Sequence, residues 1–475
     1  MKKVLVANRG EIAVRIIRAC HDLGLQTVAV YSKADAEALH VLHADEAICI
    51  GDAPSNQSYL KIPHILSACE ISGADAIHPG YGFLSENANF ASICESCGIT
   101  FIGPSAKTIA MLGDKAQAKS IAKSVRCPII PGSNGIVETV DEALKEAKKI
   151  GFPVFIKATA GGGGKGIRIA QDSEDFVRQF AAARAEAEVS FGNPDIYLEK
   201  MIFNPRHIEV QILGDEHGNY VHLGERDCTI QRRRQKLIEE TPSPVLTPHL
   251  RKKMGEAAVH LAKAAKYHTV GTVEFLLDEK KNFFFMEVNT RIQVEHTVTE
   301  ELTGIDLVKE QIKMAMGEKL LYKQKNIRME GHIFEFRINA ENPANNFMPS
   351  PGLLEYYIPS GGPNVRVDSA CYSGYRIPPF YDSMIAKLIV KGKDRADAIE
   401  ISKRALREFH IGGVYSTIPF HQYMLHNPTF LSGEGYNLAF IDTLIEEGCN
   451  FVHDESKTDT EETAPGQRTA ATTPH

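Results

Sequence analysis

The sequence lacks the features of several large classes of protein. It has no apolar run of about 18 residues, the length that a membrane-spanning helix needs. The opening MKKVLVANRG has too few apolar residues to form the apolar segment of a secretion signal. Acidic residues outnumber basic ones, for a net charge of −7, whereas nonspecific nucleic-acid binding needs a basic face. The sequence therefore predicts a protein with neither a membrane nor a nucleic-acid partner.

Cysteine is scarce, with nine residues in 475. An odd number of cysteines in a long chain without a signal predicts reduced thiols and a cytoplasmic location. The one CxxC, from Cys94 to Cys97, has no second pair. We interpret it as buried or helix-surface thiols rather than as a metal or redox site.

Two common nucleotide-binding motifs are also missing. The first predicted strand is followed by NRGEIA, which is not the GxGxxG of a dinucleotide site. The stretch KATAGGGGKGIRI, residues 157–169, is not a P-loop, because Thr159 and Gly166 stand where that motif has Gly and Ser or Thr. Strand-like runs flank these glycines, which predicts a hairpin whose tip closes on an anion.

The residues that are present predict an α/β protein of several subdomains. KKVLVA, EIAVRIIRACHDLG and QTVAVYS form a βαβ unit, so we expect residues 1–113 to form a doubly wound, Rossmann-like sheet. Residues 114–330 alternate helices with antiparallel hairpins, and residues 331–447 form a further mixed α/β domain. Residues 448–475 predict a disordered tail, since no large apolar residue follows Val452.

A row of polar residues occurs in MEVNTRIQVEH, residues 286–296. The polar residues alternate with apolar ones, which in an extended chain places them all on one face. An ordinary half-exposed strand would carry Lys, Thr or Ser there. We interpret the row as one wall of a catalytic groove, formed by Glu287, Asn289, Arg291, Gln293 and Glu295.

A further carboxylate, Glu274, lies in the predicted hairpin TVEFLL-DEKKN-FFFMEVN. A register centred between Lys280 and Lys281 places Glu274 opposite Glu287, with their Cβ atoms about 4.5–5.5 Å apart. A slip of one residue would turn one of them over. Two such carboxylates repel unless a cation lies between them, and Mg²⁺ suits carboxylates that act together with substrate phosphates. The hairpin and the glycine loop thus predict the same ligand, Mg-ATP.

Other charged stretches leave alternatives open. QRRRQK, residues 231–236, is either a solvated or nucleic-acid-binding patch or, as we favour in an acidic protein, a site for small anions. The loop HPGYGFLSEN, residues 78–87, follows a predicted parallel strand, where ligands bind. Arg337 in EFRINAENP fits a structural salt bridge as well as a ligand contact. Further lysines offer charges to phosphates: Lys115, Lys157, Lys165 and Lys200.

The chain resembles the biotin carboxylases of the ATP-grasp superfamily in eight stretches that follow the family order to near residue 446. They are ANRGEIAVRIIRA, HPGYGFLSEN, GDKAQAK, FIKATAGGGGKGIRI, ERDCTIQRRRQK, EVNTRIQVEHTVTE, EFRINAENP and PPFYDSMIAKLI. The resemblance implies an α/β ATP-grasp fold with a mobile lid at about residues 130–203. It also implies that ATP phosphorylates bicarbonate to carboxyphosphate, which delivers CO₂ to biotin.

The resemblance also implies a role for each matched residue. An ATP site would contain Lys115, Lys157, Gly163, Gly164, Glu199, Lys200, His207, Gln231 and Leu276. Two Mg²⁺ or Mn²⁺ ions would bind Glu274, Glu287 and Asn289. Bicarbonate would contact Lys236, Arg291, Gln293 and the main chain of Val294, with Glu295 as the base. Arg337 would stabilise the biotin enolate, with Tyr81 and Arg15 near the biotin.

The sequence departs from the family at Arg234, where members often have histidine, so we leave it out of the catalytic set. No Met-Lys-Met of a biotin carrier occurs, and we expect biotin on a separate biotin carboxyl carrier protein. The resemblance further implies carboxyltransferase partner subunits, a homodimer with Arg18 and Asp22 at its interface, and most simply the acetyl-CoA carboxylase system. Another ATP-grasp ligase, a nucleotide-sensing protein that has lost turnover and, last, a dehydrogenase are the alternatives.

Overall fold

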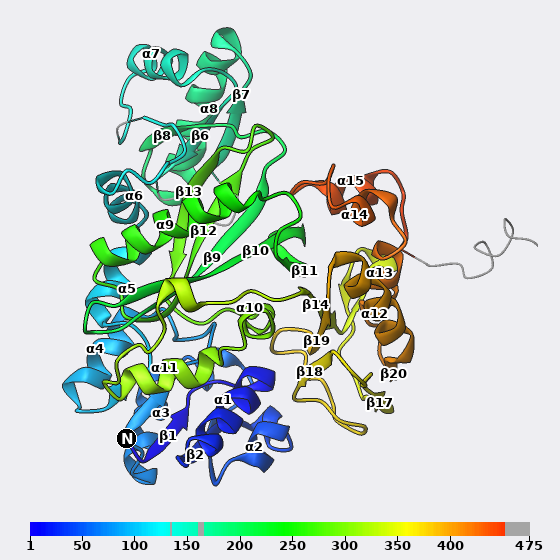
Figure 1. The fold of residues 1–475 in the computed structure, drawn as a ribbon. Helices are drawn as coiled ribbons and strands as arrows, with labels where there is room; N and C mark the ends of the chain where they lie inside the picture. Colours follow the sequence, from blue (N-terminus) through cyan, green and yellow to red (C-terminus); the bar gives the residue numbers. More distant parts are fainter. Residues whose placement is uncertain (134, 160–165, 452–475) are drawn as a thin grey trace, which may run out of the picture.

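The computed structural model describes residues 1–133, 135–159 and 166–451 (Figure 1). The predicted glycine-rich tip, including Gly163 and Gly164, lies outside the described residues, as do residues 452–475 of the predicted tail. Within the described part, no helix has the length and apolar character needed to cross a membrane. All nine cysteines belong to this part and are free thiols, which agrees with the interpretation of Cys94 and Cys97.

The N-terminal residues form a parallel five-stranded sheet in the order β3-β2-β1-β4-β5. Its strands are β1 (Lys3–Val6), β2 (Gln26–Ser32), β3 (Glu46–Gly51), β4 (Ala76–His78) and β5 (Thr100–Phe101). Helices pack around it: α1 (Gly10–Asp22), α2 (Leu39–His43), α3 (Ile62–Ser72), α4 (Ala88–Ser96) and α5 (Ala106–Gly113). On α1, Ile12, Ile16 and Cys20 are buried, as their spacing predicts. The strand order reverses between β1 and β4, where Asn8 donates to the carbonyls of Pro79 and Tyr81.

A second, antiparallel sheet of eight strands runs through the middle of the molecule, in the order β13-β12-β9-β10-β11-β14-β19-β18 (Figure 1). Five strands precede residue 330: β9 (Arg206–Gly214), β10 (Tyr220–Arg232), β11 (Gln235–Thr241), β12 (Thr269–Leu277) and β13 (Phe283–Asn289). Three follow it: β14 (His332–Asn339), β18 (Val365–Ser369) and β19 (Met384–Gly392). Because β11 pairs with β14, one sheet joins the two segments that we separated at residue 330.

The two faces of this sheet differ in chemistry. On β9, Ile208, Val210 and Ile212 pack in an apolar core with helix α9 (Pro248–Ala264). The residues between them, including Glu209 and Gln211, are polar and equally buried. Their side chains point to the opposite face. There, Arg226 donates hydrogen bonds both to Gln211 and to a threonine of helix α10 (His296–Thr303). Period two along the strand therefore separates an apolar core from a buried polar face.

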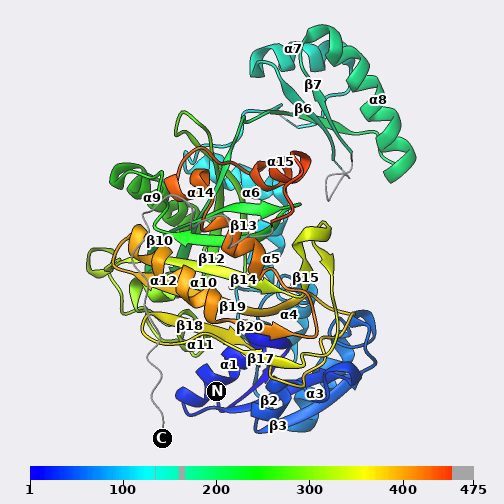
Figure 2. The same ribbon diagram turned by 90° about the vertical axis from the view of Figure 1, so that its right-hand side faces the viewer.

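A small subdomain projects from the rest of the molecule (Figure 2). It contains a three-stranded sheet in the order β7-β6-β8, with β6 (Val154–Ala158), β7 (Ile167–Ala170) and β8 (Ile196–Lys200). Helices α7 (Val140–Ile150) and α8 (Ser173–Phe191) complete it. The predicted hairpin on both sides of the glycines is confirmed, because β6 and β7 pair antiparallel from Val154 to Lys157. Helix α6 (Lys115–Ser124) precedes this subdomain.

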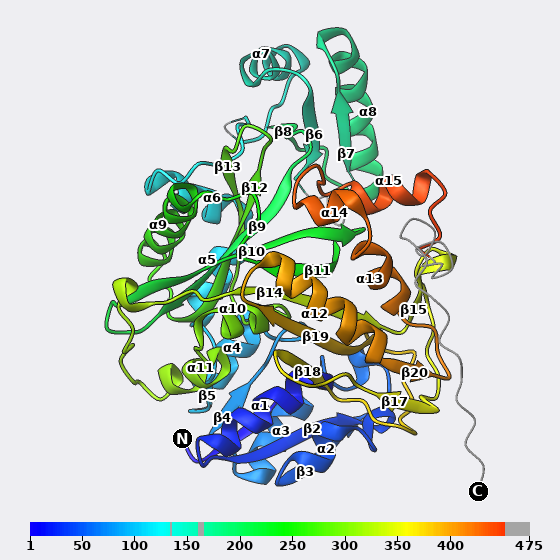
Figure 3. The same cartoon turned by 45° about the vertical axis from the view of Figure 1, so that its right-hand side comes forward.

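In the C-terminal residues, helix α12 (Arg395–Glu408) covers β14 and β19 (Figure 3). Three further helices complete the C-terminal core: α13 (Ile418–Met424), α14 (Pro428–Ser432) and α15 (Phe440–Glu446). A short pair, β17 (Tyr356–Ile358) and β20 (His410–Gly412), lies beside them. Phe451 is fully buried against Phe347 and Phe420. The predicted tail therefore starts too early at 448, because residues up to 451 reach the core.

Candidate active site

A polar cavity of about 740 Å³ opens between the β6–β7 hairpin, the polar face of the large sheet and the segment that follows β13. Thirteen of the residues predicted for a site line it: Lys115, Lys157, His207, Gln231, Lys236, Glu274, Glu287, Asn289, Arg291, Gln293, Val294, Glu295 and Arg337. They come from seven strands, one helix and one loop, so the fold gathers side chains that are up to 222 positions apart in the sequence (115 to 337).

The predicted pair of carboxylates is confirmed at one end of the cavity, where Glu274 on β12 lies directly opposite Glu287 on β13. The pairing depends on a β-bulge, since the register near the turn would place Met286 opposite Glu274. Asn289 donates to Glu274 at 2.6 Å. Burial, and then the charge of Glu274, raise the pKa of Glu287. Two acceptors that repel each other beside an amide form a donor set that suits a divalent cation.

The expectation of one continuous strand over residues 286–296 is wrong. Strand β13 ends at Asn289, and α10 begins at His296 with Glu295 as its N-cap. Residues 290–295 form no ladder with a neighbouring strand. We call this segment, Thr290 included, the Arg291–Glu295 loop. The five polar side chains still line the cavity, because the irregular main chain turns them toward it. The functional interpretation therefore survives, although its geometric basis does not.

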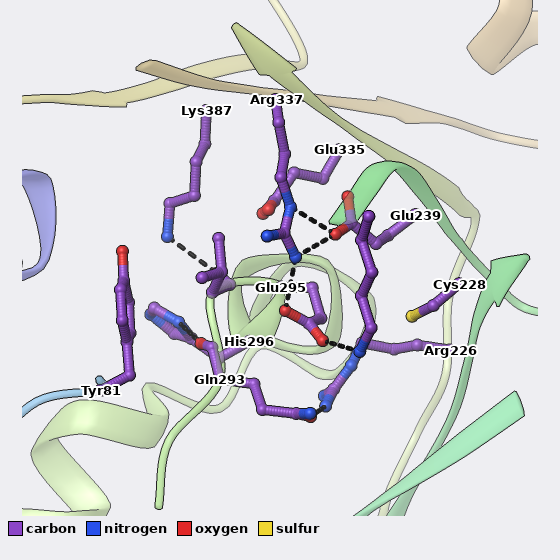
Figure 4. A network of polar contacts seen from close by, with 12 residues as sticks. Tyr81, Arg226, Cys228, Glu239, Gln293, Glu295, His296, Glu335, Arg337 and Lys387 are labelled. Atoms are coloured by element: carbon purple, nitrogen blue, oxygen red, sulfur yellow. Dashed lines mark hydrogen bonds and ion pairs between the residues drawn. The ribbon is translucent and has the colours of Figure 1, made fainter. Parts of the chain in front are cut away.

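Glu295 is held between two cations in the same cavity (Figure 4). One of these cations, Lys236, also lies 3.7 Å from Glu274, so Glu295 is close to the carboxylate pair. Lys236 Nζ bonds one carboxylate oxygen, and Arg337 Nη2 donates to the other at 2.8 Å. Burial alone would raise the pKa of Glu295, but Lys236, Arg337 and Arg226 outweigh burial and lower it. Glu295 is therefore an ionised carboxylate in a buried place, with its weak basicity offset by fixed position.

A buried charge network behind the cavity was missed from the sequence. Arg226, fully buried on β10, donates to Glu209 and to Gln293 (2.6 Å). Glu209 also accepts from Lys236 at 2.6 Å, and Glu239 accepts from Arg337 Nε at 2.6 Å. The signal that could have revealed Glu209 is the alternation of HIEVQIL, where a carboxylate stands on the polar side of a strand. The network fixes Lys236 and Arg337 around Glu295.

Two further features surround the cavity. Glu86, in the HPGYGFLSEN loop, accepts from Arg291 Nε and from the main chain of Thr290, each at 3.0 Å, and was also missed. Arg233 and Arg234 occupy a tight hairpin turn between β10 and β11, with φ values of 48° and 69°. Both are exposed and line the cavity, which supports the interpretation of QRRRQK as an anion site.

Some predicted residues lie outside this cavity. Glu199 is paired with Lys157 and with Lys119 of α6, and it lines a neighbouring cavity of about 360 Å³. Lys200 Nζ donates to the carbonyls of Gly151 and Phe152. The others do not line it either: Leu276 is half-buried on β12 next to His207 of β9, Arg15 is paired with Glu300 and Asp306, and the Tyr81 hydroxyl donates to Glu11.

Comparison with protein families assigns the whole described architecture. Residues 1–109 match the N-terminal domain of biotin carboxylase, residues 114–323 the ATP binding domain of the carbamoyl-phosphate synthase L chain, and residues 335–443 the biotin carboxylase C-terminal domain. The chain is 57% identical to biotin carboxylase 1 of Bacillus subtilis, over 93% of this chain and 98% of that protein.

Solved structures give the same result. The biotin carboxylase domain dimer of the Hydrogenobacter thermophilus 2-oxoglutarate carboxylase, in complex with MgADP, ADP and bicarbonate, superposes with a TM-score of 0.86. It is 49% identical in sequence, and the match covers 96% of this chain and 99% of that one. The biotin carboxylase component of pyruvate carboxylase superposes with a TM-score of 0.85, also at 49% identity, over 96% of this chain and 100% of that one. The expected combination of a Rossmann-like N-terminal sheet and an ATP-grasp fold is thereby confirmed. The chain belongs to the biotin carboxylase family, a family of ligases.

Proposed function

We propose that the protein uses ATP and bicarbonate to carboxylate biotin carried by a separate biotin carboxyl carrier protein, through carboxyphosphate. One observation carries the proposal. A single cavity contains a carboxylate pair suited to a metal and, beside it, a buried, ionised Glu295 between Lys236 and Arg337. Phosphorylation of a small oxyanion needs both groups together.

ATP would bind along the β6–β7 hairpin. Lys115 and Lys157 would meet its phosphates, and His207 and Gln231 line the same space. Glu199, Lys200 and Leu276 would form the adenine side with main-chain groups and apolar contact, while Gly163 and Gly164 would cover the phosphates. Glu274, Glu287 and Asn289 would hold two Mg²⁺ or Mn²⁺ ions, which supply charge neutralisation for phosphoryl transfer.

Bicarbonate would bind beside Glu295, held by Lys236, Arg291, Gln293 and the Val294 main chain. Glu295 would take the bicarbonate proton as an oxygen of bicarbonate bonds to the γ-phosphorus of ATP and ADP leaves. Lys236 and Arg337 remain cationic next to the multiply charged anionic product, where each preorganised donor is worth about 3–4 kcal/mol. Carboxyphosphate would then release CO₂ and phosphate; the phosphate would take the ureido N–H proton of biotin, and the ureido nitrogen would bond to the CO₂.

Arg337 would also stabilise the negative charge on biotin, because its guanidinium lines the cavity. Tyr81 and Arg15 would lie near the biotin. In the structure the Tyr81 hydroxyl donates to Glu11, and Arg15 is paired with Glu300.

By analogy with the relatives, we propose a division into residues 1–113, 114–330 with the lid, and 331–451, together with a cytoplasmic homodimer that works with carboxyltransferase subunits. The relative from Bacillus subtilis is named a biotin carboxylase, and a similar structure contains a dimer. We favour the first half-reaction of acetyl-CoA carboxylase, which serves malonyl-CoA and fatty acid synthesis. The alternative is the corresponding component of a pyruvate or other acyl-CoA carboxylase; solved structures from a pyruvate carboxylase and from a 2-oxoglutarate carboxylase are also similar to this chain.

The test is ATP hydrolysis in the presence of Mg²⁺ and bicarbonate, with and without free biotin. We expect biotin to stimulate phosphate release, and Glu295→Gln to remove the stimulation while nucleotide binding persists. Arg337→Ala should abolish biotin carboxylation and leave ATP binding largely intact. Phosphate release that ignores biotin would contradict the proposal. Adding purified carboxyltransferase subunits with either acetyl-CoA or pyruvate then decides between the two systems.

A further inference from the structure

The main chain of the Arg291–Glu295 loop is held by two buried side chains that the proposed reaction does not use. Lys387 Nζ donates to the carbonyl of Val294 at 2.8 Å. His296 Nδ1 lies 2.7 Å from the carbonyl of Gln293. Because a carbonyl can only accept, His296 Nδ1 carries the proton. The Gln293 carbonyl also accepts from the main-chain N–H of His296 at 3.3 Å, so His296 fixes the peptide before Val294 and Lys387 the peptide after it.

Such contacts matter here because the loop has no regular hydrogen bonding of its own. Strand β13 ends at Asn289 and α10 starts at His296, so no sheet or helix ladder sets the direction of the peptides between them. A main-chain N–H that binds a ligand must nevertheless point correctly. In this loop, side chains from elsewhere in the fold have to provide that direction.

Lys387 (Figure 4) lies on β19, which is near the opposite edge of the large sheet from β13. Its side chain is completely buried. Its Nζ also lies 3.1 Å from Glu11 of α1, and the Tyr81 hydroxyl donates to the same carboxylate. Burial lowers the pKa of Lys387, but Glu11, Glu335 and Asp368 outweigh that effect and raise it. The ammonium therefore stays charged at the point where three segments of the fold meet.

We propose that Lys387 is a positioning residue for bicarbonate: by holding the Val294 carbonyl, it fixes the peptide that joins Val294 to Glu295 and, with it, the place of Glu295. The inference rests on the proposed function. A buried lysine costs solvation, which ordinary packing would avoid by using an apolar residue. Lys387 gains a carboxylate partner in Glu11 and uses another of its donors on a single peptide of the site.

Strand β19 provides a matched control. Lys391 lies four residues after Lys387, and its Nζ donates to the carbonyl of Glu301 at 2.7 Å. It makes the same kind of contact, from a lysine on the same strand to a main-chain carbonyl. Glu301 lies on α10 and does not line the cavity. Loss of Lys391 should therefore cost packing and a hydrogen bond without reaching bicarbonate.

The experiment compares steady-state constants in bicarbonate-dependent ATP hydrolysis. Lys387→Met would leave Glu11 buried without its cation, so the test variant is the pair Lys387→Met with Glu11→Gln. We expect the KM for bicarbonate to rise on the order of tenfold to a hundredfold, the loss of one charge-assisted hydrogen bond. The KM for ATP should stay within about twofold. Lys387→Arg should recover part of the loss, since a guanidinium can also donate to the carbonyl.

Three outcomes overturn the inference. They are an unchanged KM for bicarbonate in the double variant, a parallel rise in the KM for ATP, and an equal rise in Lys391→Met. The thermal unfolding midpoint of each variant, measured alongside, shows whether the protein is folded. If the double variant is not folded, Lys387→Arg replaces it as the test variant. If the unaltered protein shows no bicarbonate-dependent hydrolysis, the proposed function fails. If the unaltered protein is active and the Lys387 variants have the same KM for bicarbonate, only the role of Lys387 fails.

Discussion

Replacement of Arg337 by Met should move the pH dependence of the reaction as well as slow it. Arg337 Nε donates to Glu239 at 2.6 Å, and Nη2 donates to Glu295 at 2.8 Å, all in a buried place. Arg337 is one of the cations that lower the pKa of Glu295, after Lys236. Without it, the buried Glu239 and Glu295 carboxylates repel each other with no guanidinium between them. The pKa of Glu295 must rise.

The size of the rise follows from the contact that is lost. A hydrogen bond to a charged group is worth about 1.5–3 kcal/mol, and one pKa unit corresponds to about 1.4 kcal/mol. The pKa of Glu295 should therefore increase by about one to two units. A base acts only when it is deprotonated, so raising its pKa moves the acid limb of the pH–rate profile to higher pH by the same amount.

The assay is bicarbonate-dependent phosphate release without biotin, so that any contact of Arg337 with biotin does not enter. The control is Arg395→Met, because Arg395 Nε donates to the neighbouring buried Glu240 at 2.9 Å. Both variants remove one partner from a buried pair, at a cost of about 3–5 kcal/mol in stability. Only Arg337→Met should shift the acid limb. A uniformly lower rate with an unmoved limb would refute Glu295 as the base that Arg337 controls.

Three further predictions concern the metal, stability and the loop. Glu287→Gln should raise the Mg²⁺ concentration for half-maximal ATP hydrolysis by about tenfold or more, whereas the exposed Glu279→Gln in the same hairpin should not; equal Mg²⁺ curves would contradict the metal assignment. Burial lowers the pKa of His421 to about 4, so the folded state binds fewer protons below pH 6.5. The stability advantage of the unaltered protein over His421→Gln, from urea unfolding, should then shrink by about 1.4 kcal/mol per pH unit from about pH 6.5 to 4, and a constant difference would count against it. Glu86→Gln removes a partly exposed pair with Arg291 and should raise the KM for bicarbonate up to about fivefold; an unchanged KM would show that Glu86 does not orient that arginine.

Local patterns in the sequence predicted most of the elements near the site. Helix α7 begins and ends where VDEALKEAKKI does, and the β9–β10 and β12–β13 hairpins pair as expected. Each is decided by neighbours along the chain: periodicity, turn residues and caps. The eight family stretches, read together, also contain eleven of the thirteen predicted residues that line one cavity; His207 and Glu274 lie outside these stretches.

The predictions were weaker where the pattern described only a period. The alternation in MEVNTRIQVEH fits a strand, but it fits equally a loop that turns polar groups one way. The bulge at Met286 was likewise invisible, although it alone puts Glu287 opposite Glu274. A period of two is a property of a few neighbours, whereas a register shift or a strand end depends on what the other side of the pair can accept.

By itself, the sequence determined the type of most elements near the site, the polar face of β13 and the chemistry available to the cavity. Only the tertiary structure decided that Glu295 would be ionised, since that depends on Lys236 from β11 and Arg337 from β14. It also decided that Lys387 would hold Val294, across 93 positions of the sequence. The physical reason is that a buried charge is set by the partners within a few ångströms of it. Those partners come from strands that are neighbours in the sheet and distant along the chain.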